Sequence, residues 1–164
     1  MSADELPKVG SGTTNGSMTF QRRPTSVPPD IRPEWRLPLL LLIVRSCRGQ
    51  LASQEQLHVL NSAILHPGAR RALFAALEGQ VASNSQMVQF EPALTRAIDR
   101  CTGLGLLSIE SGGRLRLTDL GRRVAATVES SETLFIRERE LLTALPRPLT
   151  QTAIRTALAH RHTL

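Results

Sequence analysis

The feature that most constrains the fold of this chain is a pair of short alternating segments on either side of a glycine-bearing loop. In LLSIE-SGG-RLRLT, residues 106–118, apolar and polar side chains alternate both before and after the SGG loop. Alternation across a loop of this length predicts a β-hairpin with one dry face and one wet face. Two strands alone are only marginally stable, so we expect the dry face to pack against helices. The predicted dry face consists of Leu107, Ile109, Leu115 and Leu117.

Most of the chain after residue 32 has the periodicity and the capping residues of helices. Ser53–Gln56 fits a capping box, and Thr118 is a favourable N-cap for the helix after the hairpin. In that helix we expect Leu120, Val124 and Val128 to face inward. In the helix at 92–102 the apolar positions at i, i+3, i+4 and i+7, which we expect to face inward, are Leu94, Ala97, Ile98 and Cys101. The expected helices are 33–47, the segment between Ser53 and His66, 69–78, 92–102, the segment after Thr118, 132–145 and 151–160, and a short strand is expected at 87–90.

Length and composition divide the chain into an arm and one domain. With 164 residues, 41% of them hydrophobic, the chain is long enough for one core and short for two. Residues 1–32 are rich in Gly, Ser, Thr and Pro and carry few large apolar side chains, so they cannot offset their ordering entropy. We therefore expect a disordered or partner-ordered arm at 1–32 and a folded domain at 33–164.

The net positive charge of the chain is only weak evidence that the protein binds nucleic acid. The net charge is +6, and because Lys8 is the only lysine, 19 of the 20 basic residues are arginines. A bias this complete is more typical of genomic base composition than of a device for binding phosphate, although arginine suits that purpose. The aromatic residues are four Phe, one Trp and no Tyr, which excludes the stacking platforms of single-strand and RNA-binding modules.

The order of the predicted elements indicates a fold class. Helices followed by a polar-faced helix, a hairpin and a further helix is the order of a winged helix-turn-helix core. We therefore predict a mainly α fold with a small β-hairpin, in which a winged helix-turn-helix core is extended by two C-terminal helices. In this interpretation the helix at 92–102 is equivalent to the recognition helix, and residues 111–116 form the wing.

The polar surface of the predicted winged-helix core can be interpreted in two ways. Arginines and a threonine on the 92–102 helix, the wing and the next helix could contact bases or phosphates. Asp99 lies in the middle of the exposed helix face, however, and the charge patterning of a solvated helix explains these residues about equally well. We favour a surface used against protein over sequence-specific DNA binding. The candidate DNA or partner contacts are Thr95, Arg96, Arg100, Arg114, Arg116, Arg122 and Arg123.

The two C-terminal helices add apolar faces beyond the minimal winged domain. Each face either covers the core or presents an apolar stripe to a partner helix, and the sequence favours neither. Ile154, Ala157 and Leu158 form the face of the last helix. The face of the preceding helix, a candidate partner face, consists of Leu134, Phe135, Leu141, Leu142 and Leu145.

The sequence contains no pattern typical of an enzyme, a cofactor site or a metal site. His160 and His162 have no third ligand nearby, and Gly103-Leu104-Gly105 lacks the third glycine of a dinucleotide-binding loop. Cys47 and Cys101 lie among apolar residues, where a free thiol behaves as a small hydrophobe. We therefore expect a non-catalytic protein without a cofactor. No apolar run approaches the roughly 20 residues of a membrane helix, so the expected location is the cytoplasm.

Four stretches of the chain resemble a bacterial family. RPEWRLPLLLLIVRSCRG, SQEQLHVLNSAIL, FEPALTRAIDRCTGLGLLSIESGGRLRLTDLGRRVA and TALPRPLTQTAIRTAL are similar to the middle component of ABC-three-component systems, over residues 32–160. That component resembles the small winged-helix subunit encoded between an effector and an SMC-like ABC ATPase in Lamassu-type anti-phage defence. The resemblance implies a non-catalytic adaptor that links the ATPase to the effector, with the ATPase hydrolysing ATP and engaging double-stranded DNA. It assigns no role to any single residue.

The sequence thus leaves two functional readings. In the preferred one the chain is a structural subunit of an SMC-like ATPase complex that contributes apolar faces to a permanent interface. Such a subunit would be poorly soluble or self-associated when isolated, because its interface would be exposed. In the rival reading the chain is a winged-helix transcription regulator that binds operator DNA as a homodimer.

Overall fold

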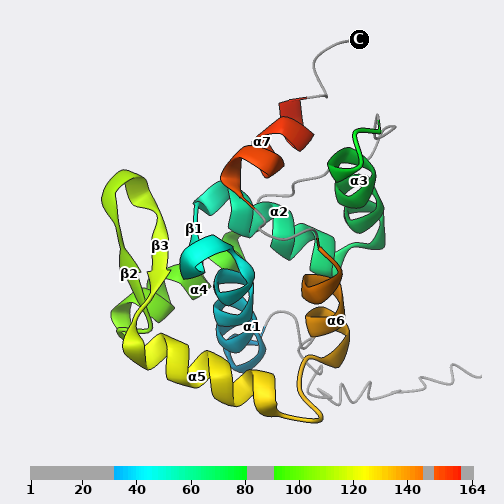
Figure 1. Cartoon of the computed structure of the whole chain (residues 1–164). Helices are drawn as coiled ribbons and strands as arrows, with labels where there is room; N and C mark the ends of the chain where they lie inside the picture. Colours follow the sequence, from blue (N-terminus) through cyan, green and yellow to red (C-terminus); the bar gives the residue numbers. More distant parts are fainter. Residues whose placement is uncertain (1–31, 81–90, 146–149, 160–164) are drawn as a thin grey trace, which may run out of the picture.

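The computed structural model describes residues 32–80, 91–145 and 150–159, so the expected strand at 87–90 and all but the last residue of the expected arm lie outside the described residues. The described chain is mainly helical, with a small antiparallel sheet at one side (Figure 1). The helices are α1 (Pro33–Ser46), α2 (Gln54–Leu65), α3 (Pro67–Leu77), α4 (Pro92–Gly103), α5 (Asp119–Ser130), α6 (Ile136–Ala144) and α7 (Gln151–Ala159). The strands are β1 (Leu51–Ala52), β2 (Leu107–Ile109) and β3 (Leu115–Leu117), and short 3-10 turns cover η2 (Arg48–Gln50) and η3 (Ser111–Gly113).

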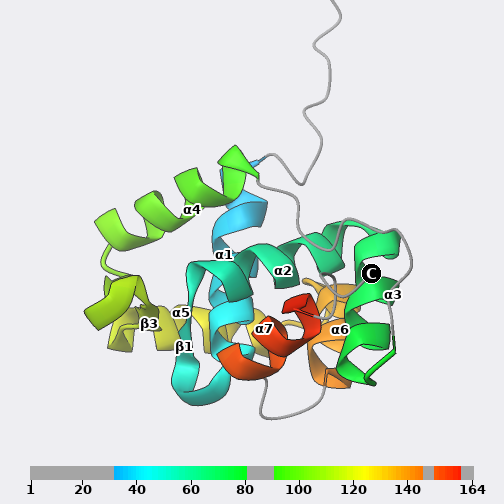
Figure 2. The same ribbon diagram turned by 90° about the horizontal axis from the view of Figure 1, so that it is seen from above.

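Helix α1 is the centre of the core. Its residues 39–44 are apolar and each is 4% exposed or less, as expected for a helix that is apolar on all sides. It contacts α2, α4, α5 and α6, which surround it in Figure 2. Pro38 lies inside α1 and cannot donate to the carbonyl of Glu34, a loss confined to the start of the helix. None of the helices in the described ranges is both long and apolar enough to cross a membrane.

The sheet contains the predicted hairpin and one strand that the sequence did not indicate. Its order is β1-β3-β2, and all neighbouring strands are antiparallel. In the register, Leu51 pairs with Arg116 and Leu107 pairs with Leu117. Strand β1 spans only two residues, which is too short to produce an alternating pattern. It ties the end of α1 to the hairpin and so links two distant parts of the chain.

The prediction of the dry hairpin face is confirmed except at its outer end. Leu107, Leu115 and Leu117 are 2% exposed or less, whereas Ile109 is 66% exposed. Ile109 is the last residue of β2, where the hairpin extends away from the helices (Figure 1). Its partner in the register, Leu115 of the central strand β3, is buried, so the core covers the centre of the sheet at this level but not the edge strand β2.

Helix α5 turns the predicted side inward except at Leu120. Thr118 caps it as expected, accepting the N–H of Gly121 at 3.0 Å. Val128 is buried and Val124 packs against the core, which confirms both predictions, while Leu120 is 43% exposed, so the prediction for Leu120 is wrong. The other buried residues of α5 are Gly121 and Ala125. A Cβ on Gly121 would lie 2.0 Å from the Leu106 carbonyl oxygen. The glycine therefore lets α5 approach the backbone before β2 closely, which leaves Leu120 on the outside.

The C-terminal helices cover the core. Helix α6 begins at Ile136, four residues later than the predicted start at 132, because Phe135 has a φ of 53° and lies in the left-handed region, which an α-helix cannot include. The Ser131 side chain accepts the N–H groups of Thr133 and Leu134 before this point. Helix α7 packs on α3 and α2, and its Ile154 is fully buried. The side chains of the predicted partners Ala157 and Leu158 lie outside the described residues.

Candidate protein and nucleic-acid interface

A buried polar network fixes the start of α4, the helix on which the predicted contact residues lie. Glu91 is the N-cap residue of α4, and its Oε2 lies 2.7 Å from Nη1 of Arg36 in α1. Asn61 of α2 joins the pair: it accepts from Arg36 Nη1 at 3.1 Å and donates to Glu91 Oε2 at 3.1 Å. Arg36 is only 5% exposed. The sequence analysis did not predict this network. An arginine and an asparagine in otherwise apolar helices could have indicated it, because buried polar side chains need polar partners.

The exposed face of α4 has the predicted composition. Leu94, Ala97, Ile98 and Cys101 are buried, and they are the four positions predicted to face inward. On the opposite side Thr95, Arg96, Asp99 and Arg100 are exposed. Among the described residues, Arg96 and Arg100 have no ion pair or side-chain hydrogen bond. They stand one helical turn apart and together present two free guanidinium groups.

The arginines of the hairpin and α5 divide into engaged and free groups. Nε of Arg116 lies 3.0 Å from Oε1 of Glu110, and its Nη1 donates to the Gly49 carbonyl at 3.3 Å. Arg122 forms an ion pair with Asp119 and donates to the Leu117 carbonyl at 2.9 Å. Arg114 and Arg123 are exposed and have no such partner among the described residues. Two of the predicted contact arginines are thus already neutralised within the chain.

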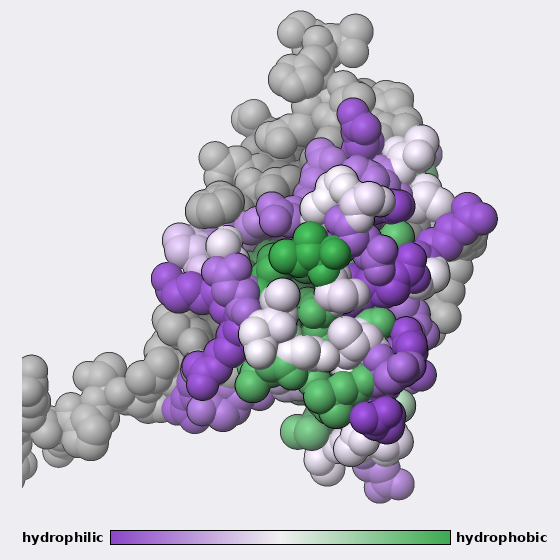
Figure 3. Space-filling model, turned by 90° about the vertical axis from the view of Figure 1, so that its left-hand side faces the viewer, coloured by the Kyte–Doolittle hydropathy of each residue, from purple (hydrophilic) through white to green (hydrophobic). Residues whose placement is uncertain are grey.

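Apolar side chains gather on the hairpin side of the molecule, which faces the viewer in Figure 3. Leu104 follows α4, Ile109 ends β2 and Leu120 lies in the first turn of α5, with exposed fractions of 54%, 66% and 43%. Thr118 holds the strand ends together, since it bonds the carbonyls of Gly105 and Leu106. We call Leu104, Ile109 and Leu120 the hairpin patch.

The candidate partner face on α6 belongs to the core instead. Leu141, Leu142 and Leu145 are 4–7% exposed, and Phe135 packs against Trp35 with ring centroids 5.7 Å apart. Of the five predicted residues, Leu134 alone is exposed, at 49%. The prediction of a partner face is therefore corrected: α6 contacts α1 and covers the core, which was the first of the two alternatives.

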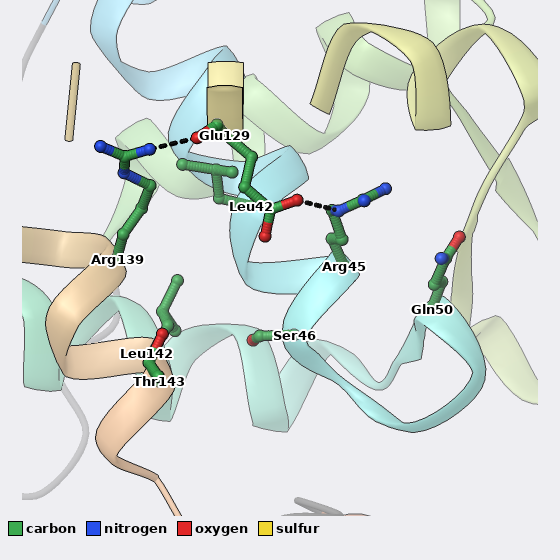
Figure 4. Close-up of a pocket in the computed structure, with 8 residues that line it drawn as sticks. All are labelled: Leu42, Arg45, Ser46, Gln50, Glu129, Arg139, Leu142 and Thr143. Atoms are coloured by element: carbon green, nitrogen blue, oxygen red, sulfur yellow. Dashed lines mark hydrogen bonds and ion pairs between the residues drawn. The ribbon is translucent and has the colours of Figure 1, made fainter. Parts of the chain in front are cut away.

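A cleft of about 270 Å³ lies between α1, α5 and α6, and Figure 4 shows its lining. Arg45 Nε pairs with Glu129 Oε2 at 2.8 Å, and Arg139 donates to the Glu129 backbone carbonyl. Both guanidinium groups thus bind Glu129 and hold the three helices together. These contacts give the cleft a structural role: the Glu129 carboxylate neutralises Arg45, whereas Arg139 contacts only the Glu129 backbone and its Nε has no hydrogen-bond partner among the described residues.

The chemically reactive side chains of the described chain are dispersed or buried. Burial raises the pKa of the Cys47 and Cys101 thiols to about 12, which keeps both protonated and inert near neutral pH. Within residues 32–80, 91–145 and 150–159, no three His, Cys, Asp or Glu side chains come close enough to hold a metal ion. The predicted pair His160 and His162 lies outside those ranges.

Comparisons with known proteins return no counterpart: no family model, no curated protein and no solved structure matches this chain.

Proposed function

We propose that this chain is a non-catalytic winged-helix subunit that docks on a partner protein through the hairpin patch. The observation that carries the proposal is the exposure of Leu104, Ile109 and Leu120, which lie just after α4, in β2 and in α5. Apolar side chains gather on the hairpin side of the molecule (Figure 3). Burying a leucine or isoleucine side chain contributes about 1.5–3 kcal/mol, so three of them are enough to anchor an interface. The engaged state of Arg116 and Arg122 beside the patch favours a protein partner over DNA.

Two features of the sheet support the winged-helix assignment. Strand β1 adds to the hairpin in the order β1-β3-β2, and α4 leads directly into β2. One feature departs from a minimal helix-turn-helix motif. The segment from Glu78 to Glu91 separates α3 from α4, whereas a helix-turn-helix is joined by about three to four residues. A domain that has the wing but a longer connection between α3 and α4 is more consistent with a protein-binding subunit than with a protein that recognises bases in the major groove.

The partners that the family resemblance implies are an SMC-like ABC ATPase and an effector. In that arrangement the chain supplies an apolar surface and a rigid support, and the chemistry lies in the partners. The central α1 and the buried network at Glu91 give the patch a fixed position relative to the rest of the domain. Preorganised apolar surface of this kind lowers the entropic cost of association.

Affinity purification of the full chain from its native gene neighbourhood tests the proposal. We expect a large coiled-coil ATPase and a neighbouring effector to be recovered with the wild-type chain. The double variant Ile109→Ser and Leu120→Ser should lose both, whereas Leu134→Ser, which changes an equally exposed leucine outside the patch, should retain them. Recovery of a lone homodimer, or equal recovery by the double variant, would contradict the proposal.

The second candidate, a homodimeric DNA-binding regulator, has one observation in its favour. Arg96 and Arg100 lie on the same exposed face of α4, free of any ion pair among the described residues. If this face binds duplex DNA, Arg96→Ala and Arg100→Ala will each weaken binding. Each substitution will also lower the number of counterions released on binding, measured from the salt dependence of the binding constant, by about one. Unchanged binding in both variants would remove this candidate.

A further inference from the structure

A second arginine-lined cleft lies at the far edge of the sheet from β2. It occupies about 230 Å³ between η2, β1, the N-terminal turn of α2, the start of β3 and the start of α7. Its lining consists of Arg48, Leu51, Gln56, Arg114, Thr150, Gln151 and Thr152. The lining contains two guanidinium groups and no carboxylate, in contrast to the cleft beside Glu129.

The two arginines are brought together by the sheet. Strand β1 pairs with β3 so that Ala52 faces Leu115, which places Arg114 next to the start of α2. The turn before β1 bears Arg48, and Arg116 holds this turn by donating to the Gly49 carbonyl. Among the described residues, neither Arg48 nor Arg114 has an ion pair or a side-chain hydrogen bond. Their charges are therefore available to a ligand.

A buried amide provides an independent donor in the same cleft. Gln56 is only 3% exposed, and its side-chain oxygen accepts the Ser53 N–H at 2.9 Å as part of a capping box. Its NH₂ group has no acceptor among the described residues. Because the capping box uses only the oxygen of the amide, this NH₂ group can donate to a ligand in the cleft.

The start of α7 adds to the positive potential. Thr150 accepts the Ala153 N–H at 3.1 Å, and the N–H groups of Gln151 and Thr152 belong to the first turn, which has no intrahelical acceptors. Helix N-termini attract anions for this reason. The cleft thus offers guanidinium, amide and backbone donors, which is the donor set that recognises phosphate oxygens.

We propose that this cleft binds a single phosphate group. Pockets that enclose a whole small molecule measure about 300–1,000 Å³, so a volume of about 230 Å³ suits one phosphate, with the rest of its carrier outside. The carrier is either a nucleic-acid backbone or a free phosphate compound. The site lies on other elements than the hairpin patch, and the proposal does not depend on a protein partner.

The test is a titration of the full-length chain with inorganic phosphate, and separately with a short DNA duplex of arbitrary sequence. Isotope-labelled protein reports the backbone N–H signals of Gln151 and Thr152, which we expect to shift with phosphate. The double variant Arg48→Gln and Arg114→Gln should raise the phosphate Kd by about a hundredfold or more, because it removes two charged hydrogen bonds that are each worth at least about tenfold. Arg71→Gln is the matched control and should leave the Kd unchanged, because Arg71 is an exposed arginine of α3 with no ion pair or side-chain hydrogen bond to the described residues.

The two arms distinguish the source of the phosphate. If the double variant weakens both duplex and phosphate binding, and phosphate competes with the duplex, the carrier is a nucleic-acid backbone. If it weakens phosphate binding only, the carrier is a free phosphate compound. The proposal is overturned if the wild-type chain shows no shift at Gln151 and Thr152, or if the double variant binds phosphate as tightly as Arg71→Gln does. Circular dichroism confirms that the variants are folded.

Discussion

The apolar face of α6 and the outer end of the hairpin differ in what covers them, although both belong to apolar faces in the sequence. Leu142 belongs to a stripe that could serve a partner, yet it is 5% exposed and packs in the core. Ile109 belongs to the predicted dry face of the sheet, yet it is 66% exposed. The difference teaches that periodicity identifies an apolar face but not what covers it, because covering depends on how far the neighbouring elements reach.

The largest expected effect comes from truncating the α6 face. Leu142→Ala should lower the free energy of unfolding by about 2–5 kcal/mol, because it opens a cavity in the core. Ile109→Ala should change it by about 0.5 kcal/mol or less, as an exposed substitution does. Urea denaturation of both variants measures the contrast. Similar losses in the two variants would break the comparison.

The next effect tests what holds the hairpin side in place. Glu91→Ala removes the carboxylate that neutralises the buried Arg36, and we expect it to lower the free energy of unfolding by about 3 kcal/mol. Glu91→Gln keeps an acceptor for Asn61 and should cost less. Thermal denaturation at neutral pH compares the two. If Glu91→Ala is as stable as the wild type, the network does not anchor α4.

A smaller effect tests why Leu120 belongs to the hairpin patch. Gly121→Ala places a methyl group against the Leu106 carbonyl and should cost about 1–3 kcal/mol, because α5 must move away from the sheet. Gly68→Ala is the control, since a Cβ at this helical glycine meets nothing within 4 Å. Should Gly121→Ala prove neutral, the close approach of α5 would not explain the exposure of Leu120.

The smallest effect concerns pH. Burial lowers the pKa of His58 below its ordinary value of 6.5, while the negative charge of Glu91 opposes this shift. The unfolded chain therefore binds a proton at a higher pH than the folded chain, so stability should fall as the pH drops through about 6.5 and below. In the His58→Gln variant the loss of folding stability between about pH 7.5 and about pH 5.5 should be smaller than in the wild type. Chemical denaturation at both pH values measures it, and an unchanged loss would show that His58 is not involved.

The sequence predicted the hairpin, the order of the helices and the inward face of α4, because these depend on local periodicity and capping. It did not predict β1, since two residues carry no pattern and the strand exists only by pairing with β3. It placed Val124 and Val128 of α5 correctly but not Leu120, because the close approach at Gly121 depends on the backbone before β2. Tertiary contacts decided both cases.

The candidate site was less accessible to prediction than the fold. The exposed arginines of α4 follow from the helical pattern, but the neutralisation of Arg116 and Arg122 depends on which carboxylates lie beside them. The cleft between Arg48 and Arg114 joins residues that are far apart in the chain and meet through the sheet. Such clusters need the topology before their charges can be compared.

The central claim is that the hairpin patch, and not the region before α6, is the surface that a partner covers. Site-specific photocrosslinking in the native cell tests this most directly, with a photoreactive phenylalanine analogue placed at position 109 in one strain and at position 134 in another. We predict a crosslink to a partner protein from position 109 and none from position 134. A crosslink to a partner from position 134 alone would contradict the account, and so would the absence of a crosslink from both positions.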